Sequence, residues 1–352
     1  MAKERIQYID IAKGIGITLV VLAHSKFPLN HFVTMFYLPM FFFISGCFFS
    51  LQSDIKTFCG KKTKQLYLRF VIVGIIMLML HPIFLRLGFY CTSIPENLKG
   101  TYMNEIPDYG VLNYIKTALK ILALNVPEQL MRPMWFIGAL WIAMVLLKVL
   151  NNLIFVKINN IVIETLIVIG IFAIGYFVSL PSFFSQGCVA MLFCWFGSKC
   201  MKNGYLQYMI QLKTQYQILL VIIGFGICAI ASWKTDLIFM TNTYTSWWTM
   251  LTSSCFGMIA MLIICYWISK TKCGIVLSYI GQHTIAILAM HMVCFKLVNL
   301  VIILVSQYDM VYMAAYPIIT NDGLWWLLYS VVGVVLPLFI QNVYYEMQTK
   351  IL

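Results

Sequence analysis

Residues 9–27 read IDIAKGIGITLVVLAHSKF, a run of 19 residues that carries ionisable side chains only towards its two ends. About 20 apolar residues suffice to cross the hydrocarbon core of a bilayer as a helix. Nine further apolar runs approach this length, at 32–50, 67–87, 134–151, 158–180, 184–199, 216–233, 246–268, 275–304 and 324–345. The sequence therefore predicts an all-α fold, a polytopic transmembrane helix bundle with about ten membrane-spanning helices.

The overall composition points the same way. Hydrophobic residues make up 62% of the 352 residues and charged residues only 10%, whereas soluble domains average about 25% charged residues and about 45–50% apolar ones. A water-soluble protein of this size could not bury so much apolar surface. The eleven cysteines lie mostly inside the apolar runs and form no CxxC pair. They are interpreted as small buried hydrophobic residues, so neither a disulfide framework nor a bound metal is expected.

The distribution of basic residues predicts how the chain is oriented. The formal net charge is +12, and the bases lie between apolar runs, which favours membrane lipids over nucleic acid as partners. With the N-terminus inside, sixteen of the 24 Lys and Arg residues fall in cytoplasmic segments, seven fall outside and Lys296 lies within a span. This asymmetry predicts a multi-pass protein of the cell inner (cytoplasmic) membrane with both termini in the cytoplasm.

One sizeable loop is expected, on the outer side. It covers residues 88–133 and ends in an apolar stretch, Val111 to Leu124, with Lys116 and Lys120 on one face, a pattern typical of an amphipathic helix at a membrane surface. No internal repeat is evident. Residues 1–352 are therefore predicted to form a single integral-membrane domain.

Ionisable residues inside spans often mark a functional path, because polarity there is costly. Lys13 and His24 are eleven residues apart, almost three helical turns, so they share a face and lie about 16 Å apart along the axis. In the ninth run His283 and His291 share a face within roughly 80°. Counting along that run brings His291 towards the depth of His24, so two helices would line one polar shaft. The alternative is that Lys13 only reaches the interface and the histidines only pack.

Several motifs resemble one family, the acyltransferase family 3 membrane proteins, and within it the branch related to fucose 4-O-acetylase. The first run resembles the family's first helix, in which ten residues separate a basic residue from a His, as they separate Lys13 from His24. Further motifs follow in family order: LPMFFFISG at 38–46, PMWFI at 133–137, and the late helix from Ile280 to His291. The resemblance thus spans residues 5 to about 291.

The resemblance implies transfer of an acyl group, usually acetyl, from cytoplasmic acetyl-coenzyme A to a hydroxyl of a cell-envelope sugar, polysaccharide or glycolipid. Its catalytic residues would be His24 as base or nucleophile, His291 as the group that orients the acceptor or shares its proton, and Asp10 paired with Lys13. The expected donor-binding residues are Lys13, Lys61, Lys62 and Lys64. The expected acceptor-binding residues are Glu128, Arg132 and Trp135. A homo-oligomer or polysaccharide-assembly proteins are further expected partners.

Two positions depart from the family pattern. Many members carry Arg where this chain has Lys13, and a pair of arginines where it has Lys61, Lys62 and Lys64. Lysine keeps the charge but lacks the bidentate fork that suits phosphate. Two other functions stay open: a multi-pass transporter or exporter of a sugar or lipid-linked glycan, coupled by histidine protonation, and a catalytically silent scaffold.

Overall fold

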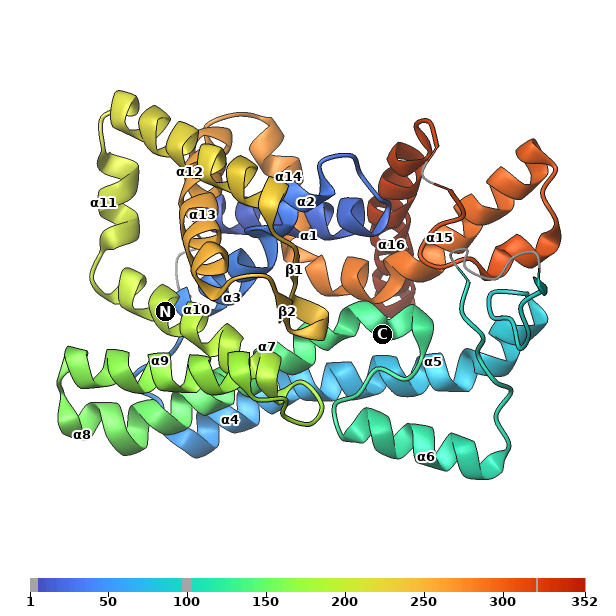
Figure 1. Cartoon of the computed structure of the whole chain (residues 1–352), viewed down its shortest axis with the longest axis horizontal. Coiled ribbons are helices and arrows are strands. Elements are labelled where there is room, and N and C mark those ends of the chain that lie inside the picture. Colours follow the sequence, from blue (N-terminus) through green and yellow to red (C-terminus); the bar gives the residue numbers. More distant parts are fainter. Residues whose placement is uncertain (1–5, 97–102, 321, 352) are drawn as a thin grey trace. The chain divides into compact units, whose positions relative to one another are not determined.

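The computed structural model describes residues 6–96, 103–320 and 322–351, and nearly all of the regular structure there is helical (Figure 1). Lys3, Arg5 and Lys99, which contributed to the predicted orientation, lie outside the described residues. The packing divides the chain into two units, and each is described by itself. The first comprises Met1–Gly16, His31–Val71 and Trp135–Gly281; the second comprises Ile17–Asn30, Ile72–Met134 and Gln282–Leu352.

The predicted runs coincide with helices, but the lengths differ. The main helices are α1 (Gln7–His24), α3 (Tyr37–Cys47), α4 (Ile55–Lys62), α5 (Leu68–Arg86), α7 (Trp135–Leu150), α9 (Ile161–Phe177), α10 (Phe184–Lys202), α12 (Thr214–Lys234), α13 (Trp247–Ser269), α14 (Cys273–Gln282), α15 (Thr284–Ser306) and α16 (Trp325–Ile351). Shorter elements connect them: α2 (Asn30–Thr34), η1 (Thr63–Tyr67), α6 (Val111–Leu122), η3 (Gln129–Met134), η4 (Asn151–Phe155), α8 (Val156–Ile158), α11 (Tyr205–Gln211), η5 (Phe239–Thr241), η6 (Met310–Ala314) and a two-stranded hairpin of β1 (Leu237–Ile238) with β2 (Thr243–Tyr244).

Six helical stretches in the described part of the chain are long and apolar enough to cross a membrane. They are Ile55–Arg86, Gln129–Ile158, Thr214–Lys234, Trp247–Ser269, Thr284–Ser306 and Trp325–Thr349. The helical multi-pass architecture is therefore confirmed, while the count of ten and the placement of the termini stay predictions.

Two of the expected runs are not single helices. Residues 32–50 are divided between α2 and the 11-residue α3. Residues 275–304 are divided at His283, which precedes α15 as its N-cap, so His283 and His291 are not two turns apart on one continuous helix. Apolar composition alone did not reveal either break, because a change of backbone direction need not interrupt the run of apolar side chains.

In the first unit, α10 packs against α3, α7 and α9, and α12 lies beside α13 (Figure 1). Glycines permit the closest helix contacts. A Cβ atom on Gly281 of α14 would lie 1.8 Å from the carbonyl oxygen of Asp10, and one on Gly14 of α1 would lie 2.0 Å from the carbonyl oxygen of Leu277. Small residues at such crossings let two backbones touch. The Gly14–Gly281 contact therefore determines where the first half of α1 lies.

The second unit contains the C-terminal half of α1, most of α5, α6, η3, α15, η6 and α16. α15 packs along α16 and also contacts η3 and η6. The amphipathic helix predicted over Val111 to Leu124 is confirmed as α6, which has 12 residues and ends at Leu122. Its exposed side includes Val111, Leu112, Ile115 and Leu119, while Ile121 is buried against Gly74 of α5.

Candidate functional site

The imidazoles of His24 and His291 meet in the second unit. Their ring centroids lie 5.2 Å apart with the ring planes nearly perpendicular, at 83°. His24 is the last residue of α1 and is half-buried, whereas His291 lies in α15 and is fully buried. The structure thus brings together two histidines that are 267 positions apart in the sequence.

Both rings are oriented by their own helices. Nδ1 of His24 lies 2.9 Å from the carbonyl oxygen of Val20, and Nδ1 of His291 lies 2.8 Å from that of Ile287. A carbonyl oxygen only accepts hydrogen bonds, so Nδ1 is the protonated nitrogen of each neutral ring. Each Nε2 then carries a lone pair, and Nε2 of His291 has no hydrogen-bond partner among the described residues. This is the tautomer that a proton acceptor needs.

Side chains of α15 and α16 support this histidine pair. The ring of Phe295 lies 5.8 Å from that of His291 and 5.0 Å from that of Tyr329. Beside His24, the hydroxyl of Ser25 is 2.9 Å from the hydroxyl of Ser330. The pair is therefore held between three helices of one unit.

The predicted Asp10–Lys13 pair is present in the first unit. Nζ of Lys13 donates to Oδ1 of Asp10 at 3.0 Å, and the ammonium group also lies 5.2 Å from the centroid of the Phe48 ring. The spacing of three residues on a helix explains the contact. Lys13 and His24 share α1, but the units divide between Gly16 and Ile17, so the two residues belong to different units.

The three basic residues of the predicted donor site follow one another along a single helical stretch. Lys61 and Lys62 end α4, and Lys64 lies in the π-helical turn η1. Lys61 and Lys64 are exposed, while Lys62 lies over the Phe58 ring at 5.7 Å. Thr63 in η1 accepts a hydrogen bond from the indole nitrogen of Trp141 at 3.1 Å, which attaches this turn to α7.

The three predicted acceptor-binding residues have separate surroundings. Arg132 lies over the ring of Tyr316 at 5.5 Å, in the second unit. Glu128, in the same unit, is fully buried beside His81. Trp135 begins α7 in the first unit and packs against Phe183. Only Arg132 and Glu128 therefore share one described unit.

The environment of Glu128 was not anticipated. Its Oε2 lies 3.2 Å from Nδ1 of His81, and Nε2 of His81 lies 3.2 Å from the carbonyl oxygen of Pro107. The ring of Tyr109 stacks on His81 at 4.1 Å. Burial and, second, the nearby carboxylate of Glu128 raise the pKa of Tyr109 to about 12. This arrangement links α5 to the segments on either side of α6.

Two further polar residues escaped the sequence reasoning. Gln129, in η3, is 1% exposed, and neither atom of its amide has a hydrogen-bond partner among the described residues. Arg132 follows three positions later, and side chains three apart in a 3₁₀-helix eclipse one another. Lys296 in α15 is fully buried. The sequence places Lys296 inside an apolar run, which marks it as unusual. It does not show which group would be the hydrogen-bond partner of Lys296.

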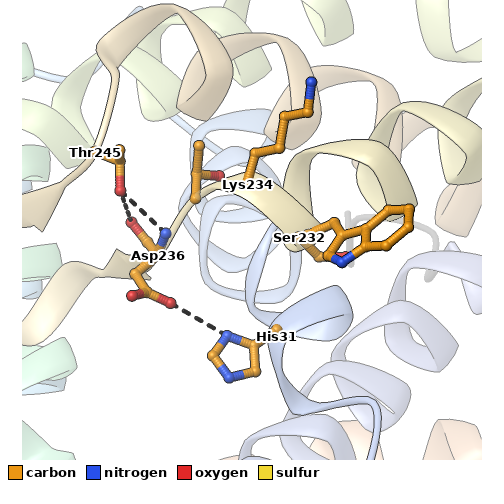
Figure 2. Close-up of a pocket in the computed structure, with 7 residues that line it drawn as sticks. His31, Ser232, Lys234, Asp236 and Thr245 are labelled. Carbon is orange, nitrogen blue, oxygen red and sulfur yellow. Dashed lines mark hydrogen bonds and ion pairs between the residues drawn. The ribbon is translucent and has the colours of Figure 1, made fainter.

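A polar pocket of about 370 Å³ opens in the first unit (Figure 2). His31 and Asp236 meet there, with Nδ1 of His31 at 3.2 Å from Oδ1 of Asp236, and the Thr245 hydroxyl accepts from the backbone nitrogen of Asp236 at 3.1 Å. Both members of the ion pair are mostly exposed. His31 therefore belongs to a pair at the protein surface.

Comparison with known proteins agrees with the family motifs. The family model described as an acyltransferase domain, that of acyltransferase family 3, matches residues 6–341. No curated protein and no solved structure gives a significant match. The matched region includes the histidine pair, the Asp10–Lys13 pair and nearly the whole chain. The chain therefore belongs to acyltransferase family 3, and it is a multi-pass membrane acyltransferase.

Proposed function

We propose that this acyltransferase is an O-acetyltransferase of the cell inner membrane. It moves an acetyl group from cytoplasmic acetyl-coenzyme A to a hydroxyl of a cell-envelope sugar, polysaccharide or glycolipid. The observation that carries this proposal is the His24–His291 pair, in which both Nδ1 atoms face helix carbonyls and each Nε2 is left as a proton acceptor.

His24 is the proposed base, because it is the half-buried and therefore accessible member of the pair. Its Nε2 accepts the proton of the acceptor hydroxyl while that oxygen attacks the carbonyl carbon of the thioester. A carbon–oxygen bond forms, the carbon–sulfur bond breaks, and His24 returns the proton to the departing sulfur, so that coenzyme A leaves as its thiol. His291 holds the His24 ring at its edge-to-face angle and polarises the acceptor.

The donor is bound by basic side chains on the cytoplasmic side. Lys13, oriented by Asp10, and Lys61, Lys62 and Lys64 are the groups proposed to bind the phosphates of acetyl-coenzyme A. Arg132 is proposed to bind the acceptor, and it lies beside an aromatic ring, that of Tyr316. Glu128 and Trp135 complete the proposed acceptor set.

Sided membrane vesicles test this function directly. Inside-out vesicles that contain the protein should transfer label from radioactive acetyl-coenzyme A, added outside, to methyl pyranosides enclosed in the lumen, including methyl fucopyranoside, or to glycolipid in the vesicle membrane. Sealed right-side-out vesicles should not, because the donor cannot reach the cytoplasmic lysines. Label that is retained on the wild-type protein and absent from His24→Ala would identify His24 as a nucleophile. Absence of labelled acceptor in both kinds of vesicle would contradict the proposal.

Replacing Lys13 with Ala should weaken binding of acetyl-coenzyme A roughly tenfold or more, since a hydrogen bond to a charged group contributes about 1.5–3 kcal/mol. Lys13→Arg should bind the donor normally, because it keeps the charge. Lys270→Ala is the matched control: Lys270 also lies over an aromatic ring, that of Tyr266 at 4.2 Å. Titration of purified protein with the donor measures the affinity. Equal affinities for Lys13→Ala and the wild type would make Lys13 an interfacial anchor.

A further inference from the structure

Lys296 is an ionisable residue in the middle of an apolar helix, and its hydrogen-bond partners among the described residues are backbone carbonyls, with no carboxylate. It lies in α15, ten residues before the end of that helix, and is fully buried. Its Nζ donates to the carbonyl oxygens of Met313 at 3.0 Å and Ala315 at 2.8 Å. Ionisable groups at such positions are costly and are usually functional. The partners of Lys296 indicate its role.

After α15 the chain folds back along that helix, so that the carbonyl oxygens of Met313 and Ala315 reach Lys296. The segment Met310–Ile319 is called the re-entrant segment for that reason. Lys296 lies ten positions before Ser306, the last residue of α15, which is roughly 15 Å along the axis. A carbonyl group within reach of Lys296 therefore lies well before the end of the helix. Met313, Ala314 and Ala315 are all buried. Non-helical backbone at membrane depth is tolerated only where protein groups satisfy it or a cavity borders it. Met310–Ala314 forms the 3₁₀-helix η6. The last carbonyl groups of this helix and the non-helical stretch Ala315–Ile319 therefore need hydrogen-bonding partners.

Three buried side chains supply these partners. Besides Lys296, Asn299 places its Nδ2 at 3.3 Å from the carbonyl oxygen of Ala315. Tyr329 of α16 donates to Oδ1 of Asn299 at 2.6 Å and accepts from the backbone nitrogen of Ile319 at 3.2 Å. Lys296, Asn299 and Tyr329 together satisfy backbone groups at both ends of the stretch from Met313 to Ile319.

The segment held in this way carries Tyr316, whose ring lies under Arg132. On α15, Lys296 follows His291 by five residues, about 7.5 Å, and Phe295 packs between His291 and Tyr329. The same packed network thus contacts the histidine pair at one end and the Arg132–Tyr316 pair at the other. All of these residues belong to the second unit.

We propose that Lys296 is a positioning residue that holds the re-entrant segment Met310–Ile319 as one wall of the acceptor-binding site, with Tyr316 and Arg132 facing the polyhydroxylated acceptor. This inference rests on the proposed function, in which Arg132 binds the acceptor and His24 deprotonates it. Loss of Lys296 leaves two carbonyl groups without their main donor, so the wall shifts while the donor side is unaffected.

Lys296→Met tests this proposal, with Lys148→Met as the matched control. Lys148 is also fully buried and also donates to two backbone carbonyls, those of Ser50 at 2.9 Å and Leu51 at 3.3 Å, but it lies in the first unit. Lys296→Met should raise KM for methyl pyranoside on the order of 10- to 100-fold with KM for acetyl-coenzyme A unchanged. Lys148→Met should leave KM for the pyranoside within about twofold of the wild type.

A second variant and a second measurement separate this role from a general loss of folding. Tyr329→Phe keeps the ring packing and removes only the hydroxyl, so it should raise KM for the pyranoside in the same direction by a smaller factor. Hydrogen–deuterium exchange in Met313–Ile319 should rise in Lys296→Met and Tyr329→Phe but not in Lys148→Met.

Faster exchange with an unchanged KM for the pyranoside would overturn the proposal, because the segment would then be structural only. Unchanged exchange in Lys296→Met would overturn it as well. If the proposed function is wrong, the wild-type protein acetylates no acceptor. Hydrogen–deuterium exchange would then still report whether Lys296 holds the segment.

Discussion

His24→Ala is expected to lower the rate of acetyl transfer by a factor on the order of 10²–10⁴, the usual contribution of a general base. Donor affinity and folded yield should be nearly unchanged, because the substitution removes one hydrogen bond, that from Nδ1 to the Val20 carbonyl at the end of α1. Single-turnover transfer from labelled acetyl-coenzyme A measures the rate, and size-exclusion chromatography measures the yield.

His31→Ala is the matched control for this result. His31 also has its Nδ1 in a polar contact, 3.2 Å from Asp236, but it is exposed and belongs to the first unit. Its removal should leave the rate within about twofold, as for most surface substitutions. A well-folded His24→Ala protein that transfers acetyl at the wild-type rate would refute the role of His24 as the general base.

The same mechanism predicts how the two histidines combine. His291→Ala should also slow transfer, because the ring of His24 loses its neighbour at 5.2 Å. If both residues act on one proton, the double variant should lose less than the product of the two single losses, since groups that act as a unit are not additive. Strict multiplication of the two losses would show that they act independently.

The second large effect is expected from Gly281→Ala. A Cβ atom at this position would lie 1.8 Å from the carbonyl oxygen of Asp10 and 2.9 Å from the backbone nitrogen of Gly14. Overpacking costs about 1–3 kcal/mol of stability, occasionally more. Here the added Cβ atom would meet backbone atoms, so no flexible side chain could move aside. The variant should therefore lose most of its folded yield or several degrees of Tm, and the protein that remains should bind acetyl-coenzyme A poorly because Asp10 and Lys13 are displaced.

Gly170→Ala provides the comparison for that experiment. Gly170 lies within α9, and nothing would approach its Cβ atom within 4 Å. Ala has the higher helix propensity by about 0.8–1.0 kcal/mol, so this variant should be neutral or slightly stabilised. Fluorescence-detected size-exclusion chromatography over a temperature series compares the two. An equal Tm for both variants would show that the α1–α14 crossing is not tight.

Much of this protein could be inferred from the order of residues alone, because the inferences concerned groups near one another in the chain. Long apolar runs form helices wherever water is excluded, since only helices then satisfy the backbone locally. The spacing of three residues placed Lys13 beside Asp10. The ordered motifs identified a family that the family model then matched over residues 6–341.

Contacts between residues that are far apart in the sequence could be identified only from the tertiary structure. A run of apolar residues can continue through a change of backbone direction. The helix breaks at residues 35–36 and at His283 were therefore visible only in the structure. Three contacts join separate elements: His24 with His291, Glu128 with His81, and Lys296 with the carbonyl oxygens of Met313 and Ala315. A buried polar side chain needs a hydrogen-bond partner. The packing of the helices determines which backbone group reaches that side chain, and the local sequence does not specify it.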